Sequence, residues 1–438
     1  MTSTERTDFR LFAVTGDPIL HSRSPALFSH MLKARGIAGA YLRLSAADFG
    51  EALRVGQALG LDGLNVTAPF KDQAAALCEP GHEAVRRLGA ANLLLRKGET
   101  WLGFNTDPDG VIGALEAVHF QVQGKRVVVL GAGGAGRAAA WALRDHGAEV
   151  VLVNRGVVRA REAAEEIGCA WAGLDAMQGE LAKADGLVSC LPGDVLPLEA
   201  AWLHPGLTVL DANYARGKVG ILAAAAGCKQ ASGLDWLLHQ ALSGMERLFG
   251  DAESSALLKD ALTQKSSARP NVALCGLMGS GKTSVGRLLA RKLGWDFVDV
   301  DALVEERSGR SVGDVFASDG EAAFRAQETE ALRIACAAEG RVIACGGGAV
   351  LSPANRELLN KHCTSIWLWS SPEVCASRLA GEARPLLVGT DRRSRLEDLL
   401  KERLAHYAQC ADLVLESESR SPDEVAERIH GELSQLSD

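Results

Sequence analysis

The chain lacks several features that would assign it to a specialised class. No run of eighteen apolar residues occurs, so no segment is expected to span a membrane. The ten cysteines include no C-x-x-C pair, which argues against a zinc site or a disulfide framework and favours reduced thiols in a cytoplasm. The formal net charge is −8, so nucleic acid is not an expected partner. The start, M-T-S-T-E-R-T-D-F-R, has no apolar core, and we expect no signal peptide.

The remaining composition is that of a globular protein. The chain has 438 residues, of which 47% are hydrophobic and 23% charged. This length exceeds what one hydrophobic core normally serves, so two or three domains are expected. No internal repeat links the two halves, and either a monomer or a homodimer is compatible with the sequence.

A phosphate-binding pattern lies beyond the middle of the chain. Residues 276–283 read G-L-M-G-S-G-K-T, between an apolar run at 272–275 and a helical pattern at 285–293. This order of strand, glycine loop and helix is the setting in which G-x-x-x-x-G-K-[ST] binds a nucleoside triphosphate, although an ordinary glycine-rich turn is the alternative. Lys282 would reach the outer phosphates, and Thr283 would place its hydroxyl on Mg²⁺. The residues expected to bind ATP here are Gly276, Met278, Gly279, Ser280, Gly281, Lys282, Thr283 and Ser284.

A polar turn near the start of the chain precedes a helix expected to reach about Arg35. Residues 16–25 read G-D-P-I-L-H-S-R-S-P. Ser24 fits the N-cap position, with Pro25 at N1. Alternatively, Ser22 and Ser24 hold an anionic group such as a carboxylate beside the helix N-terminus. Spacing alone favours the capping role.

Three further loops carry polar groups. They read G-L-N-V-T-A-P-F-K at 63–71, G-A-A-N at 89–92 and G-F-N-T-D at 103–107. Lys71 and Asp107 would form a proton-transfer pair if the fold brings their loops together, whereas an isolated lysine is usually a solvated surface residue.

A dinucleotide-binding pattern follows. The apolar strand K-R-V-V-V-L at 125–130 enters G-A-G-G-A-G at 131–136 and then an alanine-rich helix. The next strand, 149–153, ends in Asn154 and Arg155, where an NAD site would present an acid. Arg155 and Arg159 suit the 2′-phosphate of NADP. The alternative is that they are solvent-exposed residues at the start of a helix, with no role in binding. The expected cofactor-binding residues are Gly131, Ala132, Gly133, Gly134, Ala135, Gly136, Asn154, Arg155 and Arg159.

The first 250 residues resemble the shikimate dehydrogenase family. That family carries H-S-x-S-P, N-V-T-x-P-x-K, G-A-x-N and G-x-N-T-D in the order found here. The resemblance implies that Lys71 and Asp107 are the catalytic acid/base pair, and it favours the carboxylate role for the two serines. The implied substrate-binding residues are Ser22, Ser24, Asn65, Thr67, Lys71, Asn92, Asp107, Tyr214 and Gln240, and the resemblance adds Gly233 to the cofactor-binding residues. The chain departs from the family pattern at Gly156, where the family has Thr, and at 188–194, V-S-C-L-P-G-D.

Further motifs follow the phosphate loop. Asp299 and Asp301 end an expected strand, where paired acids serve a metal and a substrate or are simply solvated. Arg325 lies in G-E-A-A-F-R-A-Q-E at 320–328, where a salt bridge to Glu321 is the alternative to a binding role. A glycine triplet occupies 346–348, R-P-L-L at 384–387 has the composition of a mobile lid, and Arg403 precedes Tyr407.

Residues 270–438 resemble the shikimate kinase family over their whole length. The resemblance implies that Asp301, Arg325, Gly347 and Arg403 bind shikimate, and that Thr283 and Asp299 hold Mg²⁺. It also places Arg378 and Arg384 at ATP. Lys282 and Arg384 would be catalytic, with Arg384 stabilising charge on the transferred phosphoryl group.

The sequence therefore predicts an α/β protein of three folded parts. An α/β substrate-binding subdomain, 1–107, would be completed by returning helices at 234–262. A Rossmann NADP-binding subdomain would occupy 108–233, and a P-loop kinase domain 270–438, after a linker at 263–269.

The two resemblances imply a bifunctional enzyme of aromatic biosynthesis, using NADPH, ATP and Mg²⁺. It would reduce 3-dehydroshikimate to shikimate and then phosphorylate shikimate to shikimate 3-phosphate. Two alternatives remain: a dehydrogenase that prefers quinate, or a regulatory protein that senses shikimate or quinate through degenerate enzyme domains.

Overall fold

The computed structural model describes residues 9–192, 194–213, 217–250, 255–263, 269–380, 385–387 and 391–436. The chain forms two compact units. The first comprises Met1–Pro25, Leu32–Asp62 and Lys265–Asp438, and the second comprises Ala26–Met31 and Gly63–Gln264. None of the helices within the described ranges has the length and apolar character needed to cross a bilayer.

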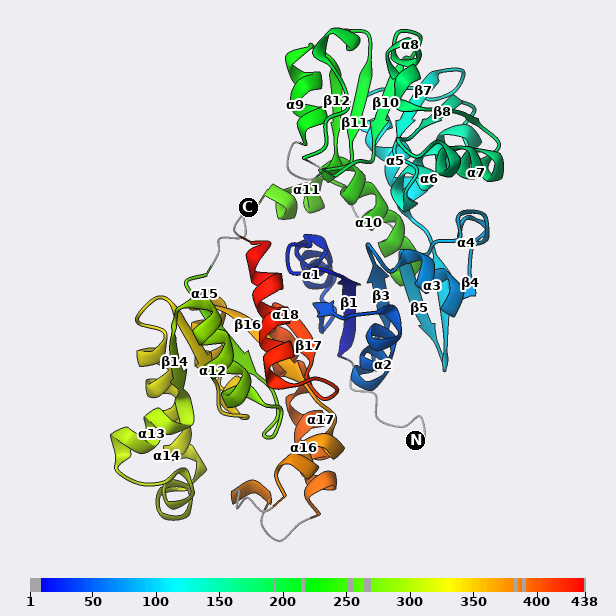
Figure 1. Ribbon diagram of the computed structural model, residues 1–438. Helices are drawn as coiled ribbons and strands as arrows, with labels where there is room; N and C mark the ends of the chain where they lie inside the picture. Colours follow the sequence, from blue (N-terminus) through cyan, green and yellow to red (C-terminus); the bar gives the residue numbers. More distant parts are fainter. Residues whose placement is uncertain are drawn as a thin grey trace. The chain divides into compact units, whose positions relative to one another are not determined.

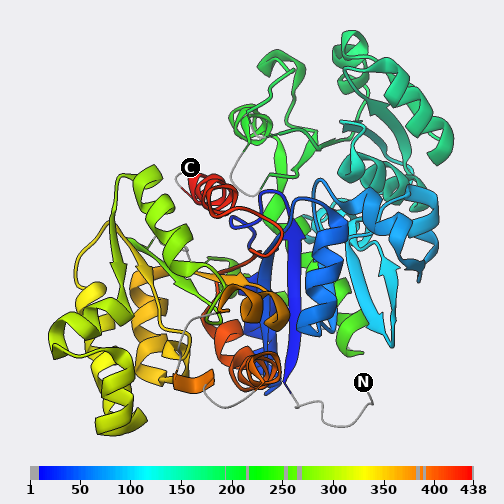
Figure 2. The ribbon, with the colours of Figure 1, turned by 60° about the horizontal axis from the view of Figure 1, so that its bottom comes forward.

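A parallel sheet runs through the first unit (Figure 1). Its strands, in spatial order, are β14 (Asp296–Asp299), β15 (Arg341–Ala344), β13 (Asn271–Cys275), β16 (Cys363–Trp369), β17 (Leu413–Glu416), β2 (Gly39–Ser45) and β1 (Arg10–Gly16). Every neighbouring pair in this series is parallel. Strands from the two ends of the sequence therefore share one sheet, because β17 pairs with β2 through Val414 with Leu44 and Leu415 with Ser45 (Figure 2).

Most of the described helices of the first unit begin after a side chain that accepts a backbone N–H group. The helices are α2 (Phe49–Leu59), α12 (Lys282–Leu293), α13 (Val300–Ser308), α14 (Val312–Ala335), α15 (Pro353–His362), α16 (Pro372–Arg378), α17 (Arg392–Cys410) and α18 (Pro422–Ser434), with short 3₁₀ turns η3 (Ala349–Leu351) and η4 (Pro385–Leu387). Helix α1 (Ser24–Ala34) is divided between the units, because Ala26–Met31 belongs to the second. Helices α15, α16 and α18 each start with a Ser–Pro pair, in which the serine accepts a backbone N–H and proline occupies N1. Helix α14 changes direction at Gly320, whose φ of +81° is outside the helical region.

The second unit contains a doubly wound parallel sheet. Its order is β12 (Lys229–Ser232), β11 (Thr208–Asp211), β10 (Gly186–Ser189), β7 (Arg126–Leu130), β8 (Glu149–Val153) and β9 (Ala170–Ala172). Alternate residues of β7 serve different cores: Val127 and Val129 join one apolar cluster, while Val128 and Leu130 join another. The first cluster is completed by α6 (Gly134–Asp145) and α7 (Val157–Ile167), the second by α8 (Met177–Leu181) and α9 (Lys218–Ala225) (Figure 1). The turns η1 (Leu174–Ala176) and η2 (Ala200–Trp202) connect these elements.

The rest of the second unit contains a smaller group of strands and helices. The strands are β3 (Gly63–Val66), β5 (Leu93–Lys97), β6 (Thr100–Phe104) and β4 (Glu79–Pro80), and the helices are α3 (Lys71–Leu77), α4 (Glu83–Leu88), α5 (Asp107–Ala117), α10 (Gly233–Phe249) and α11 (Ser255–Thr263). Helix α5 packs closely on α10: a Cβ added to Gly110 would lie 2.5 Å from Trp236 Cδ1. The predicted α/β class, with a Rossmann-type part and a P-loop part, is confirmed.

Two predicted element positions were wrong. Asp301 was expected at a strand end, but β14 ends at Asp299 and Asp301 lies in the first turn of α13, because the Asp299 carboxylate caps that helix. Thr263 was expected to open the linker, but it is the last residue of α11.

Two candidate active sites

The first site, here called the lysine–aspartate site, lies in the second unit. Lys71 and Asp107 are the first residues of α3 and α5, and the Lys71 Nζ atom lies 2.5 Å from Asp107 Oδ2. Their side chains are 18% and 5% exposed, so the ion pair is shielded from water on most sides. The predicted pairing of an amine and a carboxylate from separate loops is therefore present in the structure.

Amide side chains hold the carboxylate in place. The Asn92 Nδ2 atom donates to the other Asp107 oxygen at 2.9 Å and to Thr106 Oγ1 at 3.1 Å, while Asn92 Oδ1 accepts the Thr106 N–H at 2.8 Å. Asn65 donates to the Asn92 backbone carbonyl at 3.3 Å. Thr67 closes the intervening turn by accepting the Phe70 N–H. Asn65, Asn92, Asp107 and Lys71 are thus linked in one network, and Thr67 lies in the turn that precedes Lys71.

Sequence reasoning did not assign a role to Cys190, which follows β10. Its thiol pKa is raised by burial, and the charges of Asp107 and Asp211 act in the same direction while Lys71 opposes them. Cys190 therefore lies within electrostatic range of the lysine–aspartate pair and stays protonated. The departure of 188–194 from the family pattern was the available signal.

Two other residues predicted to bind the substrate lie later in the sequence. Gln240 lies on α10, and Tyr214 lies outside the described residues.

The glycine loop before α6 is shaped for close approach of a ligand. Gly131 has φ +108°, and a Cβ added to Gly136 would lie 1.7 Å from the Gly131 carbonyl oxygen, so neither position tolerates a side chain. A Cβ on Gly133 or Gly134 would meet nothing within 4 Å, which leaves this backbone accessible at the start of α6. Such an N-terminus attracts phosphate.

The residues after β8 leave positive charge available beside this loop. Asn154 Oδ1 accepts the Ala132 N–H at 3.4 Å and ties the two segments together. Arg155 and Arg159 are exposed, and within the described ranges neither guanidinium has a hydrogen-bond or ion-pair partner. A Cβ on Gly233 would lie 2.4 Å from the Ala212 carbonyl, so this residue is required for chain packing. The glycine loop at 131–136, which includes Ala135, would accept the pyrophosphate of a dinucleotide. Arg155 and Arg159 would suit an additional phosphate on its ribose.

The second site, here called the phosphate-loop site, lies in the first unit. Gly276, Gly279 and Gly281 have φ of +139°, +83° and +92°, values that favour glycine. Lys282 Nζ donates to the carbonyls of Gly276 and Leu277 at 3.0 and 2.7 Å, which folds its side chain over the loop. Burial lowers the pKa of Lys282, and Asp301 partly opposes this effect.

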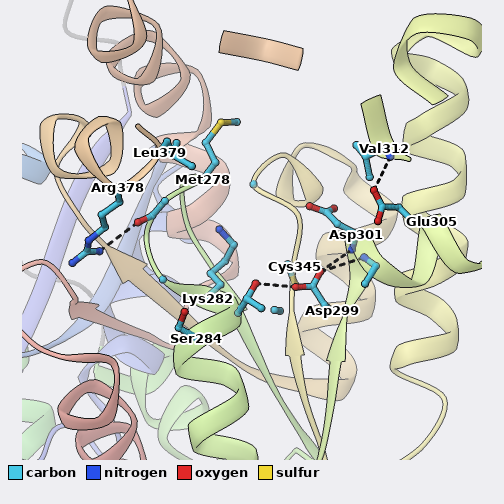
Figure 3. Close-up of a pocket in the computed structure, with 16 residues that line it drawn as sticks. Met278, Lys282, Ser284, Asp299, Asp301, Glu305, Val312, Cys345, Arg378 and Leu379 are labelled. Carbon is cyan, nitrogen blue, oxygen red and sulfur yellow. Dashed lines mark hydrogen bonds between the residues drawn. The ribbon is translucent and has the colours of Figure 1, made fainter. Parts of the chain in front are cut away.

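A cavity of about 500 Å³ opens beside this loop (Figure 3). Its lining includes Met278, Gly279, Gly281, Lys282, Thr283, Ser284, Asp299, Asp301, Gly347 and Arg378. Thr283 Oγ1 donates to Asp299 Oδ2 at 2.8 Å, so a hydroxyl and a carboxylate oxygen meet at its wall (Figure 3). This oxygen pair fits Mg²⁺, which takes few protein ligands and keeps water or phosphate oxygens. Arg378 donates to the carbonyls of Gly279 and Ser417 at 3.3 and 2.7 Å.

A smaller cavity of about 80 Å³ shares Met278, Asp301 and Gly347 with the larger one. It adds Arg325 and Arg403, so two guanidinium groups converge on it. Asp301 and Glu328 also line this cavity, so the lining can offer guanidinium donors to a carboxylate and carboxylate acceptors to hydroxyl groups.

The two arginines are held differently. Arg325 donates to Glu328 at 2.8 Å and also to Glu321 at 3.0 Å, so the alternative salt bridge forms within the site. Arg403 is 2% exposed and donates to the Gly347 carbonyl at 2.9 Å, while its buried Nε has no partner among the described residues. Tyr407, not assigned a role from sequence, also donates to the Gly347 carbonyl, at 2.5 Å. Ser280, within the phosphate loop, is fully buried. Arg384 lies outside the described residues.

Comparison with known proteins gives matches to both parts of the chain. Family models described as "Shikimate dehydrogenase substrate binding domain", "Shikimate / quinate 5-dehydrogenase" and "Shikimate kinase" match residues 14–94, 114–205 and 278–434. A shikimate dehydrogenase (NADP⁺) of Haloarcula marismortui is 39% identical over 250 residues, covering 55% of this chain and 94% of that protein. A shikimate kinase of Symbiobacterium thermophilum is 46% identical over 168 residues, covering 38% of this chain and 97% of that protein.

A solved structure extends the comparison. The shikimate 5-dehydrogenase of Thermus thermophilus in complex with NADP(H) and shikimate has a TM-score of 0.53 at 32% identity. The match covers 58% of this chain and 98% of that one. Both resemblances inferred from the motifs are therefore confirmed.

Proposed function

Because the chain belongs to the shikimate dehydrogenase family over its first part and to the shikimate kinase family over its last, we propose that it catalyses two consecutive reactions. It reduces 3-dehydroshikimate with NADPH, and it transfers the γ-phosphoryl group of ATP to the new 3-hydroxyl. The observation that carries this proposal is the presence of an intact proton-transfer pair and an intact phosphate loop with a guanidinium-lined cavity in one chain.

In the first reaction, NADPH supplies the hydride to C3. Lys71 Nζ donates the proton to the carbonyl oxygen, and Asp107 holds the ammonium group at the reacting atom. Asn92 keeps Asp107 oriented, and Asn65 and Thr67 contact the ring hydroxyls with it. Ser22 and Ser24 hold the substrate carboxylate, and Gln240 and Tyr214 complete the substrate site. Arg155 and Arg159 bind the 2′-phosphate of the cofactor.

In the second reaction, the chain contributes positioning and charge. The backbone of the phosphate loop and Lys282 hold the phosphates, while Thr283 and Asp299 hold Mg²⁺. Arg325 and Arg403 bind the carboxylate of shikimate, with Asp301 and Gly347 at the ring. Arg378 and Arg384 contact ATP. Arg403 lines the small cavity, and its buried Nε has no partner among the described residues, which supports a role in binding an anion because a buried donor normally has a partner.

The test is a pair of assays on the full chain with matched variants. With 3-dehydroshikimate and NADPH we expect NADPH consumption, and addition of ATP should yield shikimate 3-phosphate. Lys71→Met should lower the dehydrogenase kcat by about 10²–10⁴-fold and leave the kinase unchanged. Lys282→Met should lower the kinase kcat by about 10²–10³-fold and leave the dehydrogenase unchanged.

Each alternative gives a different result in these assays. Faster turnover of quinate than of shikimate by the dehydrogenase would identify a quinate enzyme. Binding of shikimate without either turnover would identify a sensing protein. A Lys71→Met variant with kcat within about threefold of the wild type would contradict the role of Lys71.

A further inference from the structure

The turn that carries Ser22 is held by the last helix of the chain. We call residues 16–25 the serine turn. Glu432, near the end of α18, accepts the backbone N–H groups of Ile19 and Leu20 through one carboxylate oxygen, at 2.9 and 2.8 Å. Glu432 is 2% exposed, Ile19 is fully buried and Leu20 is 4% exposed. The carboxylate and the two donors are therefore largely buried, although Glu432 also lines a cavity of about 610 Å³ together with Asp17 and Arg428.

The bonds at Ile19 and Leu20 bear directly on the position of Ser22. The Ser22 N–H donates to the Ile19 carbonyl at 2.9 Å, so residues 19–22 form one closed turn. The Ser22 hydroxyl oxygen accepts the Ser24 N–H at 3.4 Å, and Ser22 is 6% exposed. A shift of the Ile19–Leu20 peptide thus moves the Ser22 side chain and the start of α1.

A second side chain, Arg43, also holds the serine turn. Arg43, on β2, donates to the Ser22 carbonyl through Nε at 3.0 Å and Nη2 at 2.7 Å. Its Nη1 donates to the carbonyl of Asp412, at 3.3 Å, immediately before β17. Asp412 is itself bound to Arg269 and to the Ser365 N–H. The Ser22 backbone is therefore connected to the kinase-family part of the chain at two points, Glu432 and Asp412.

We propose that Glu432 is a positioning residue for the dehydrogenase reaction, contributed by the kinase-family part of the chain. It sets the serine turn so that Ser22 and Ser24 meet the substrate carboxylate. This inference rests on the proposed function, in which the two serines bind that carboxylate. Its consequence is that the dehydrogenase site depends on a residue 413 positions beyond Ile19.

The test uses the full-length enzyme and three changes at Glu432. Glu432→Met removes the acceptor with little change in size. We expect it to raise KM for 3-dehydroshikimate about tenfold or more, with kcat nearly unchanged, because a carboxylate contact is made equally in the ground and transition states. KM for NADPH and the kinase parameters should stay as in the wild type. Glu432→Gln keeps a carbonyl oxygen that can accept both N–H groups, so it should restore KM to within about threefold.

Two controls separate positioning from loss of structure. Glu427→Met alters an exposed residue of the same helix whose bonding partner among the described residues is Lys292, so KM should not change. In a Ser22→Ala, Ser24→Ala background, Glu432→Met should have little further effect on KM, since the groups it positions are gone. If Glu432→Met fails to fold, Glu432→Asp replaces it: its shorter side chain should draw the turn back and raise KM by a smaller factor.

The outcomes discriminate clearly. The positioning role would be overturned if KM for 3-dehydroshikimate were unchanged in Glu432→Met, or in Glu432→Asp where that variant is used. It would also be overturned if Glu427→Met raised this KM equally. A third contrary result would be that Glu432→Met raises KM as much in the Ser22→Ala, Ser24→Ala background as in the wild type. A wild-type enzyme that binds 3-dehydroshikimate but does not reduce it would overturn the proposed function as well.

Discussion

Arg420 lies between two buried carboxylates that come from opposite ends of the sequence. Its Nη1 donates to Glu51 Oε1 at 2.9 Å and to Glu416 Oε2 at 2.8 Å, and its Nη2 bonds to the second oxygen of Glu51. The side chains of Arg420, Glu51 and Glu416 are 16%, 4% and 5% exposed. Glu51 lies on α2 and Glu416 ends β17, so the cluster connects the part of the sheet formed by β2 and β1 with the part formed by the kinase-family strands.

Replacing Arg420 by methionine should destabilise the first unit strongly. Removing one partner from a buried ion pair lowers the free energy of unfolding by about 3–5 kcal/mol. Both carboxylates keep other donors: Glu51 accepts the Ala47 N–H, and Glu416 accepts the N–H groups of Glu418 and Ser419. We therefore expect a loss near the lower end, about 3 kcal/mol.

The assay is urea unfolding of the full chain, followed by tryptophan fluorescence and by both residual activities. A matched control is Arg393→Met, because Arg393 is 58% exposed and pairs with the exposed Glu373 and Glu397. Such surface pairs contribute below about 1 kcal/mol. The reasoning would be refuted if Arg420→Met changed the unfolding free energy by no more than Arg393→Met does, since the buried cluster would then be energetically neutral.

Two further predictions concern the cofactor and the fusion itself. Arg155→Asp should weaken NADPH binding far more than NADH binding, because we propose that Arg155 binds the 2′-phosphate, which NADH lacks. Equal losses of affinity for the two cofactors would show that Arg155 has no role in this discrimination. A chain ending at Lys265 lacks β17 and Glu432, so it should reduce 3-dehydroshikimate with a higher KM than the intact enzyme, whereas a fragment with an unchanged KM would show that the dehydrogenase does not need the rest of the chain.

The motifs were predictable because each is local. The phosphate loop and the dinucleotide loop each combine a strand, a glycine turn and a helix within about thirty residues, so their spacing specifies the structure. The Lys71–Asp107 pair was an expectation conditional on the fold, and the structure brings the two residues together. Where local pattern misled, at Asp301, a capping carboxylate ended the strand earlier than the alternation of acids suggested.

The contacts between distant segments were not predictable in this way. The pairing of Val414 with Leu44 and the bond from Ile19 to Glu432 join segments from opposite ends of the sequence. Glu432 lies in an ordinary amphipathic helix, and its sequence context contains nothing that distinguishes it from the exposed Glu427. The linker predicted at 263–269 gave no indication of these contacts, because the composition of a connecting segment does not describe the surfaces that it brings together.

The sheet contact explains what the fusion changes physically. Strands β2 and β17 would each be a sheet edge in separate chains, and an edge strand presents unpaired N–H and C=O groups. Their ladder has only the two residue pairs Val414 with Leu44 and Leu415 with Ser45, too little to hold separate proteins together. A covalent connection makes this pairing intramolecular at an effective concentration on the order of millimolar, so a weak ladder suffices.

The side chains around the ladder then determine its geometry. Arg428 on α18 donates to Ser45 Oγ at 2.9 Å and to the Ala46 carbonyl, and it pairs with Asp17 at 3.2 Å. Doubling the length of a connecting segment raises the free energy of closing it by only about 0.6 kcal/mol. Removing one partner of a buried ion pair lowers the free energy of unfolding by about 3 kcal/mol or more. The dependence that we propose for the dehydrogenase site would therefore reside in β17 and α18.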